Sequence, residues 1–199
     1  MSKIKQIIWD WNGTLLDDVG MCVNVMNVML KSYSMPPISE DRYKQIFDFP
    51  VKEYYSRLGF DFNRHAFEKV GHEFMDYYFQ ELPNCLLFSD AKNILDHFKQ
   101  LEIKQLILSA MEHEALEMSL KQKGIHSYFD KVQGIDNHLA NGKKELAREL
   151  LKSSGVSAQE TLFIGDTVHD LQVAQSIGCQ CILISRGHFS KERLLTNHN

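Results

Sequence analysis

The sequence contains few cysteines and prolines and no cluster of basic residues, and each shortage argues against a class of protein. Its four cysteines show neither CxxC spacing nor a regular framework, so we expect free, mostly buried thiols rather than disulfides. The sequence has only four prolines, and 44% of its residues are hydrophobic and 24% charged. This composition is typical of a folded globular protein and argues against a disordered chain. With a formal net charge of −4 and no basic cluster, no nucleic-acid partner is expected.

Long apolar runs are also absent from the sequence. No segment approaches the roughly 18 apolar residues needed to cross a bilayer, so no membrane partner is expected. The first residues lack the apolar stretch and the small-residue cleavage site of a secretory signal. We therefore expect a cytoplasmic protein. Its oligomeric state is expected to be a monomer or a homodimer. A chain of 199 residues has room for one α/β core and a small additional unit.

The first expected element is a short apolar strand, Ile4–Asp10, and Asn12-Gly13 indicates a tight turn just after it. Between Asp18 and Phe88 the sequence changes to helical periodicity interrupted by proline and glycine. This stretch predicts helices over Val19–Tyr33, Ser39–Ile46, Pro50–Leu58 and Asn63–Leu82. The helical stretch is therefore an insertion between the first strand and the rest of the chain.

Beyond Phe88, predicted helices alternate with short apolar strands. The helices are expected over Asp90–Leu101, His113–Lys123, Lys143–Ser153 and Leu171–Ile177, with a short helix near the end. The strands are expected over Gln105–Leu108, Lys131–Ile135, Thr161–Ile164 and Cys181–Ile184. This alternation predicts an α/β fold, a doubly wound, Rossmann-like parallel sheet of five strands with an inserted all-helical cap. Residues 1–16 and 87–199 would form the core, and residues 17–86 the cap.

Four features lie at or just past the ends of predicted elements, where open α/β sheets bind ligands. The first is Asp10, followed by a turn sharp enough to need glycine. The second is Ser109, whose hydroxyl and following N–H groups are suited to holding a phosphate oxygen. The third is Lys143 after Asn141-Gly142, where an ammonium can neutralise a phosphoryl group. Taken singly, these residues are more simply a turn aspartate, an N-cap serine and a surface lysine.

The fourth feature is a pair of carboxylates, Asp166 and Asp170, four residues apart after a predicted strand. Carboxylates that pack together repel each other unless a cation lies between them, and oxygen-rich sites of this kind suit Mg²⁺. The simpler explanation is that both acids stabilise a helix N-terminus. The pair alone leaves both explanations open.

In this order and at these strand ends, the four features resemble the signature of the haloacid dehalogenase superfamily of phosphohydrolases. The four motifs correspond to Asp10-Trp11-Asn12-Gly13-Thr14-Leu15, Ser109, Lys143, and Gly165-Asp166 with Asp170. The inserted helices resemble the small cap of the phosphoglycolate phosphatase and β-phosphoglucomutase branch. Residues 181–188 resemble the last strand and turn of the phosphoglycolate phosphatases, so the resemblance covers nearly the whole chain.

The resemblance implies a Mg²⁺-dependent phosphatase that acts on a small phosphorylated metabolite. Asp10 would attack phosphorus and form an aspartyl-phosphate, which water then hydrolyses. Mg²⁺ would be held by Asp10, the backbone carbonyl of Asn12 and Asp166. Asp170 would act on the metal directly, through water, or by orienting Lys143.

The same resemblance implies which residues hold the substrate. Ser109 and Lys143 would bind the phosphoryl oxygens. Further substrate contacts are expected from Gly13, Thr14 and Ala110 near the nucleophile, and from Asp48 and Arg57 in the cap. Lys144 is the rival of Lys143, but a helix that buries Leu146 and Leu150 cannot give neighbouring lysines one orientation. The family pattern of a small residue followed by lysine favours Lys143.

Asn12 departs from the family pattern, because phosphatases of this family usually carry an aspartate there that protonates the leaving alcohol and activates water. An amide cannot transfer a proton at neutral pH. The substrate would therefore have a good leaving group or supply its own acid, or a cap histidine such as His65 or His72 would substitute. Alternatively, the chain is a catalytically impaired relative that binds phosphate and Mg²⁺ in a regulatory or interaction role.

Other activities of the superfamily fit the sequence less well. A dehalogenase does not need the acid pair, and a phosphonate hydrolase needs a cap lysine, for which Lys44 and Lys52 are the candidates. A mutase needs the proton transfer that Asn12 cannot provide. A phosphatase is therefore the favoured activity.

Overall fold

The computed structural model describes residues 3–135 and 142–197. In these residues five strands form a parallel sheet in the order β5-β4-β1-β6-β7. The strands are β1 (Gln6–Trp9), β4 (Lys104–Glu112), β5 (Lys131–Ile135), β6 (Thr161–Gly165) and β7 (Gln180–Leu183). Because β1 is paired with β4 on one side and with β6 on the other, the residue after β1 lies at the centre of the sheet's carboxyl edge. The predicted α/β, doubly wound sheet of five strands is confirmed.

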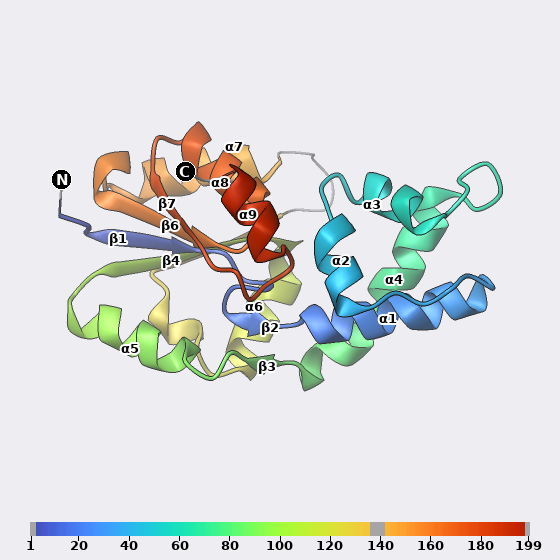
Figure 1. Cartoon of the computed structure of the whole chain (residues 1–199). Helices are drawn as coiled ribbons and strands as arrows, with labels where there is room; N and C mark the ends of the chain where they lie inside the picture. Colours follow the sequence, from blue (N-terminus) through green and yellow to red (C-terminus); the bar gives the residue numbers. More distant parts are fainter. Residues whose placement is uncertain (1–2, 136–141, 198–199) are drawn as a thin grey trace.

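Helices cover both faces of this sheet (Figure 1). They are α5 (Ala91–Gln100) and α6 (His113–Gln122) on one face, and α7 (Lys143–Ser154) and α8 (Val168–Ser176) on the other. Alternate residues of the strands pack against the two layers, since side chains along a strand point to opposite faces. Ile7 and Ile107 belong to the core cluster that includes α5 and α6, whereas Ile8 and Leu106 pack with α7 and α8.

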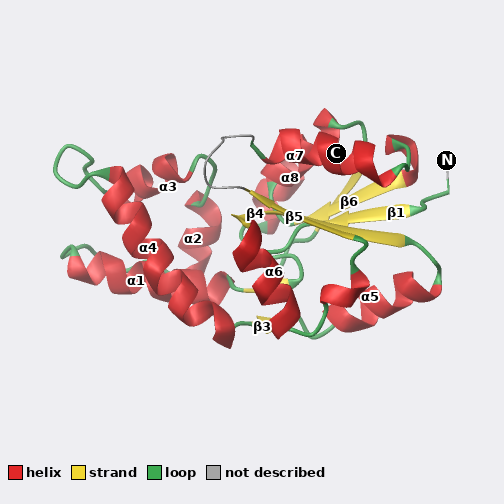
Figure 2. Ribbon diagram, turned by 180° about the vertical axis from the view of Figure 1, so that it is seen from behind, coloured by secondary structure: helices red, strands yellow, loops and turns green. Residues whose placement is uncertain are grey.

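A second group of helices lies beyond the carboxyl ends of the strands, and Figure 2 shows it from behind. It contains α1 (Val19–Ser32), α2 (Glu40–Ile46), α3 (Val51–Leu58) and α4 (Phe67–Glu81). The chain leaves the sheet region through β2 (Leu16–Asp17) and returns through β3 (Leu86–Leu87), which pair antiparallel. Short 3₁₀ turns lie at Leu82–Asn84, His126–Tyr128 and Ala158–Glu160, and α9 (Lys191–Asn197) follows β7.

Most predicted boundaries agree with the structure to within two residues, and the larger differences have physical causes. Helix α4 begins at Phe67 rather than Asn63, because Asp61 accepts hydrogen bonds from the amides of the three residues at 63–65 and closes a turn there. Helix α8 begins three residues early, at Val168, because Thr167 forms a capping box with Asp170. Strand β4 extends to residue 112 across a shift of register, and β2 and β3 were not expected.

Candidate active site

Asp10 is buried at the carboxyl end of the central strand β1. Its backbone amide donates to the carbonyl of Ile164 in the neighbouring strand β6, which extends the ladder to the carboxylate itself. One carboxylate oxygen accepts a hydrogen bond from the Thr14 hydroxyl at 3.2 Å, and the other contacts the ammonium of Lys143. Burial, reinforced by the nearby charge of Asp170, raises the pKa of Asp10 to about 6 even though Lys143 opposes the shift.

Lys143 is the first residue of α7 and is almost fully buried. Residues three, four and seven positions further on, Leu146, Ala147 and Leu150, form the apolar face of the helix, so the side chain of Lys143 is turned the same way. Its ammonium contacts Asp10 and lies 2.6 Å from Asp170. Although burial opposes the charge, these two carboxylates raise the pKa of Lys143 above its usual range.

Asp166 and Asp170 complete a buried group of carboxylates with Asp10, and one oxygen of each lies within 4.8 Å of the others. Burial raises the pKa of Asp166 to about 8, and the charges of Asp10 and Asp170 act in the same direction. For Asp170 burial is outweighed by Lys143, which lowers its pKa. Three carboxylates at this spacing repel one another, and a single lysine does not compensate all of them.

This donor set fits a Mg²⁺ ion, because hard divalent cations prefer carboxylate and carbonyl oxygen ligands. The backbone at Gly13 and at Gly187 also lies close to the carboxylate of Asp166. A Cβ atom at Gly13 would lie 2.4 Å from a carboxylate oxygen of Asp166, and one at Gly187 would lie 2.1 Å from it. Only glycine allows such an approach. Asn141, expected in the turn before Lys143, lies outside the described residues.

Ser109 lies in β4, where the pairing register with β5 shifts between Leu108 and Glu112. Such an irregularity re-aims side chains and is common beside active sites. The Ser109 hydroxyl accepts from the amide of Met111 at 3.0 Å and lies 3.4 Å from the side-chain oxygen of Asn12. Glu112, not Ser109, caps helix α6, which removes the simpler explanation of this serine. Ser109 and Ala110 both line the cavity beside Asp10.

Asn12 is held by groups that the sequence analysis did not select. Its side-chain nitrogen donates to the Asp18 carboxylate at 2.8 Å and to the hydroxyl of Tyr78 at 2.7 Å. Asp18 also accepts from the backbone amide of Gly13 at 2.9 Å, which fixes the turn after Asp10. Because Tyr78 belongs to α4, this network joins the inserted helices to the loop that carries Asp10.

His188 forms a second link between the inserted helices and the core. Its Nε2 lies 3.2 Å from Asp18, and its Nδ1 lies 2.8 Å from the hydroxyl of Tyr43 in α2. Burial favours a neutral ring, but Asp18 outweighs burial and raises the pKa of His188 to about 9. The backbone amide of His188 donates to Asp166 at 2.6 Å. A charged His188 therefore donates from both ring nitrogens and fixes Asp18.

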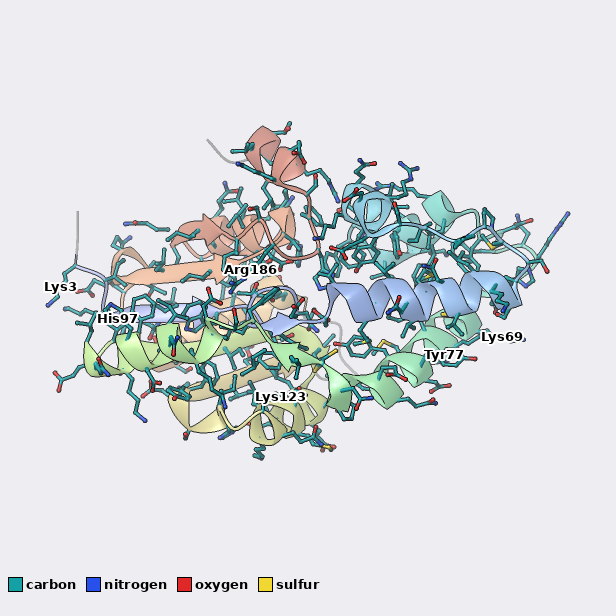
Figure 3. The ribbon with its side chains drawn as sticks, turned by 60° about the horizontal axis from the view of Figure 1, so that its bottom comes forward. Lys3, Lys69, Tyr77, His97, Lys123 and Arg186 are labelled. Atoms are coloured by element: carbon teal, nitrogen blue, oxygen red, sulfur yellow. The ribbon has the colours of Figure 1, made fainter. Side chains whose placement is uncertain are left out.

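Arg186, labelled in Figure 3, also contacts the loop that follows Asp10. Its guanidinium pairs with Asp90 at 2.7 Å, donates to the carbonyl of Thr14 at 3.3 Å, and lies 4.0 Å from the ring centre of Phe88. Sequence reasoning missed Asp18, Tyr43, Tyr78 and Arg186 as contributors. The position of Asp18 just before α1 marks it in the sequence as a candidate N-cap. In the structure its side chain does not cap α1 and instead accepts a hydrogen bond from the amide of Gly13.

A cavity of about 210 Å³ connects this centre with the inserted helices. Among the residues singled out from the sequence, Asp10, Asn12, Ser109, Ala110, Lys143, Asp166 and Asp170 line it. Asp48 and Arg57 pair with each other at 3.1 Å outside the cavity lining. Neither His65, whose ring contacts Tyr33, nor His72 lines it, and the same holds for Lys44 and Lys52.

The fold and the site together define an α/β protein with a buried acidic centre beneath a group of helices. A model of the haloacid dehalogenase-like hydrolases matches residues 7–184, so the chain belongs to that family. No helix within residues 3–135 and 142–197 is long and apolar enough to span a membrane.

Similar proteins are phosphatases with different named substrates. A phosphoglycolate phosphatase from Synechococcus elongatus is 23% identical over 194 residues, covering 96% of this chain and 89% of the relative. An N-acetylmuramic acid 6-phosphate phosphatase from Pseudomonas aeruginosa is 22% identical over 196 residues, covering 96% and 85%. A haloacid dehalogenase-like hydrolase structure from Streptococcus pneumoniae superposes with a TM-score of 0.85 at 20% identity, covering 100% and 92%. The structural likeness shows a shared fold.

Proposed function

We propose that the protein is a Mg²⁺-dependent phosphatase that acts on a small phosphorylated metabolite through an aspartyl-phosphate on Asp10. The observation that carries this proposal is the buried contact of Lys143 with both Asp10 and Asp170, beside Asp166, at the carboxyl edge of the sheet. A cation at this position can neutralise a phosphoryl group as it approaches a carboxylate nucleophile. The named phosphatases among the relatives support the same reaction class.

In the proposed mechanism the Asp10 carboxylate attacks phosphorus in line with the leaving oxygen, and water later attacks the same phosphorus to release phosphate and Asp10. Ser109 and Lys143 position the phosphoryl oxygens. A Mg²⁺ held by Asp10, Asp166 and the carbonyl of Asn12 would screen the repulsion between the nucleophile and the anionic substrate.

Asp170 is proposed to orient Lys143 rather than to act as a full metal ligand. One of its oxygens lies 2.6 Å from Lys143. The other accepts from the Thr167 hydroxyl at 2.7 Å and from the Thr167 amide at 3.0 Å, which completes the cap of α8. With both oxygens engaged, Asp170 holds the lysine at a fixed position beside Asp10.

The reaction is proposed to be restricted to substrates with good leaving groups. Asn12 is engaged with Asp18 and Tyr78, and an amide supplies no proton in any case. General acid–base catalysis contributes about 10²–10⁴-fold, so simple alkyl phosphates should react slowly. This same observation favours a second candidate function, a catalytically impaired relative that binds Mg²⁺ and phosphate. We also propose that the chain is divided into a core, residues 1–16 and 87–199, and a helical cap, residues 17–86.

The test measures phosphate release from acetyl phosphate, whose leaving group needs no proton, with and without Mg²⁺. The native protein should turn over this substrate, whereas Asp10→Asn should lose turnover and still bind inorganic phosphate in calorimetry. If the native protein binds Mg²⁺ and phosphate but releases none from acetyl phosphate, the second candidate function holds. Turnover that Asp10→Asn retains would contradict the proposed nucleophile.

A further inference from the structure

We propose that the substrate is a phosphate monoester of a phenol, with a single uncharged ring as its leaving group. This inference rests on the proposed phosphatase function and names its substrate class. Two independent features support it: the aromatic lining of the cavity beyond Asp10, and the lack of a proton donor at Asn12.

Aromatic and apolar side chains of the inserted helices line much of the cavity. These residues come from α2, α3 and α4 and the turn between α2 and α3: Tyr43, Phe47, Phe49, Val51, Tyr54 and Phe74. Several of their rings pack on one another, and the edge of one ring meets the face of the other where Phe47 contacts Tyr54, with ring centres 5.2 Å apart. Met75 and Met111 complete this wall. Aromatic and thioether groups bind a ring well but offer an ionic group little.

Among the described residues around the cavity, no cation is available for a second anionic group. Among the described residues that line it there is no arginine, and Lys143 is the lining lysine. Lys143 is held between Asp10 and Asp170, and His188 is paired with Asp18. The remaining histidine, His169, packs its ring on Phe49 at 5.2 Å. A leaving group that carries a carboxylate would therefore be buried without a counter-ion, which is costly.

The size of the cavity suits a leaving group of about one ring. The cavity measures about 210 Å³ and must also hold the transferred phosphoryl group. An apolar protein cavity of about 150 Å³ is large enough for benzene. A single ring therefore fits beside the phosphoryl group in this arrangement of the inserted helices.

A phenol also removes the need for a proton donor. A phenolic hydroxyl has a pKa near 10, against about 15.7 for water, so a phenolate departs without prior protonation. In the first step a bond forms between an Asp10 oxygen and phosphorus, and the bond from phosphorus to the phenolic oxygen breaks with its electron pair. In the second step water displaces Asp10 and gives inorganic phosphate. The phenolate takes its proton from solvent, so the balance is ester plus water to phenol plus phosphate.

The test uses four substrates that separate the ring from the leaving group. Phenyl phosphate offers both an aromatic ring and a good leaving group, benzyl phosphate only the ring, acetyl phosphate only the leaving group, and 2-phosphoglycolate neither. We expect phenyl phosphate to have the highest kcat/KM. Benzyl phosphate should turn over at least about 100-fold more slowly because its alkoxide needs a proton. In calorimetry with Asp10→Asn, benzyl phosphate should bind at least tenfold more tightly than 2-phosphoglycolate.

A charge placed in the cavity wall provides the matched variant. Met75 lines the cavity and is 39% exposed, so Met75→Lys can keep its ammonium partly hydrated while bringing a cation to the wall. This variant should reduce the preference for phenyl phosphate over 2-phosphoglycolate at least tenfold. Met118→Lys adds the same charge on α6, outside the cavity lining, and should leave the preference unchanged.

The outcomes separate the inference from the proposed function. If none of the four substrates releases phosphate, the phosphatase function itself fails. If acetyl phosphate is hydrolysed but phenyl phosphate is no better than 2-phosphoglycolate, only the substrate class is overturned. Tighter binding of 2-phosphoglycolate than of benzyl phosphate to Asp10→Asn would also overturn it.

Discussion

The side-chain nitrogen of Asn12 lies 2.8 Å from the carboxylate of Asp18, and it also donates to Tyr78 of α4. Asp18 is 1% exposed and is further held by Gly13 and His188. An aspartate at position 12 would bring a second buried carboxylate against it, and like charges at this distance disfavour ionisation of both. The amide at position 12 and the acid at position 18 therefore belong together as a complementary pair.

Exchanging the two side chains should restore proton transfer without this repulsion. We expect Asn12→Asp alone to lower the free energy of unfolding by about 1–3 kcal/mol, since it removes a hydrogen-bond donor from a buried acid. The double variant Asn12→Asp/Asp18→Asn removes the repulsion but also loses the ion pair of Asp18 with His188, so it should recover only part of that loss. It should also raise kcat for an alkyl phosphate by at least about tenfold, within the range of general acid catalysis. Denaturant unfolding and phosphate release measure the two effects.

The single variant Asp18→Asn is the control for this exchange. It loses the ion pair with His188 but gains no acid at position 12, so alkyl phosphates should turn over no faster. An exchange variant that is stable and still no faster than the native protein would refute the account of Asn12.

The sequence predicted the parts of the molecule that depend on local patterns. Apolar strands alternating with amphipathic helices were sufficient for the sheet, and the apolar face at Leu146 and Leu150 indicated that Lys143 and Lys144 point in different directions. Strand ends brought Asp10, Ser109 and Asp166 together because parallel strands share a carboxyl edge. Each of these inferences needed only neighbours along the chain.

The residues that the sequence did not predict depend on contacts between distant segments. Tyr78 reaches Asn12 across 66 positions, and His188 reaches Asp18 across 170, so no local spacing marks them. Asp48 and Arg57 were selected as substrate contacts because of their place in the expected cap. In the structure Asp48 pairs with Arg57 and lies 3.3 Å from Arg193, and neither Asp48 nor Arg57 lines the cavity. The sequence of a turn between two helices does not show which way its side chains face.

Removal of the Lys143 charge should abolish activity and destabilise the fold. Lys143→Met leaves Asp10 and Asp170 buried without their shared cation, and breaking a buried ion pair costs about 3–5 kcal/mol. Lys144→Met is the control on the same helix, and it should change the free energy of unfolding by less than about 0.5 kcal/mol. Thermal or denaturant unfolding, with phosphate release from acetyl phosphate, provides the measurement. Equal losses in the two variants would contradict the assigned roles.

A side chain at Gly13 should disrupt the acidic centre. Gly13 has a φ of +70°, and a Cβ atom there would lie 2.4 Å from Asp166 and 2.6 Å from a ring carbon of His188. Gly13→Ala should therefore lower stability by more than the roughly 1–2 kcal/mol of the backbone conformation alone, and weaken Mg²⁺ binding in calorimetry.

Gly71 in α4 is the matched control for Gly13, because a Cβ atom there meets nothing within 4 Å. Gly71→Ala should instead stabilise the protein by about 0.5–1 kcal/mol through better helix propensity, and leave Mg²⁺ binding unchanged. If Gly13→Ala binds Mg²⁺ as the native protein does, the close approach to Asp166 has no part in the metal site.

Arg193 should keep the inserted helices closed over the site. From α9 it donates to the backbone carbonyls of Lys44 at 3.1 Å and Phe47 at 2.6 Å, and its guanidinium lies 3.6 Å from the ring centre of Phe189. Both carbonyls belong to α2 and the residue after it, so one side chain ties the last helix to the cavity wall. Hydrogen bonds to a charged group contribute about 1.5–3 kcal/mol.

We expect Arg193→Gln to speed amide hydrogen exchange in α2 and α3 and to raise KM for phenyl phosphate several-fold, because closure over the substrate becomes less favourable. Exchange in the strands β1 and β6 should not change, since Arg193 does not contact them. Arg148→Gln removes the same charge from an exposed pair with Glu145 on α7 and controls for a general effect of charge. Faster exchange across the whole chain in Arg193→Gln would mean that Arg193 supports global stability rather than closure of the inserted helices.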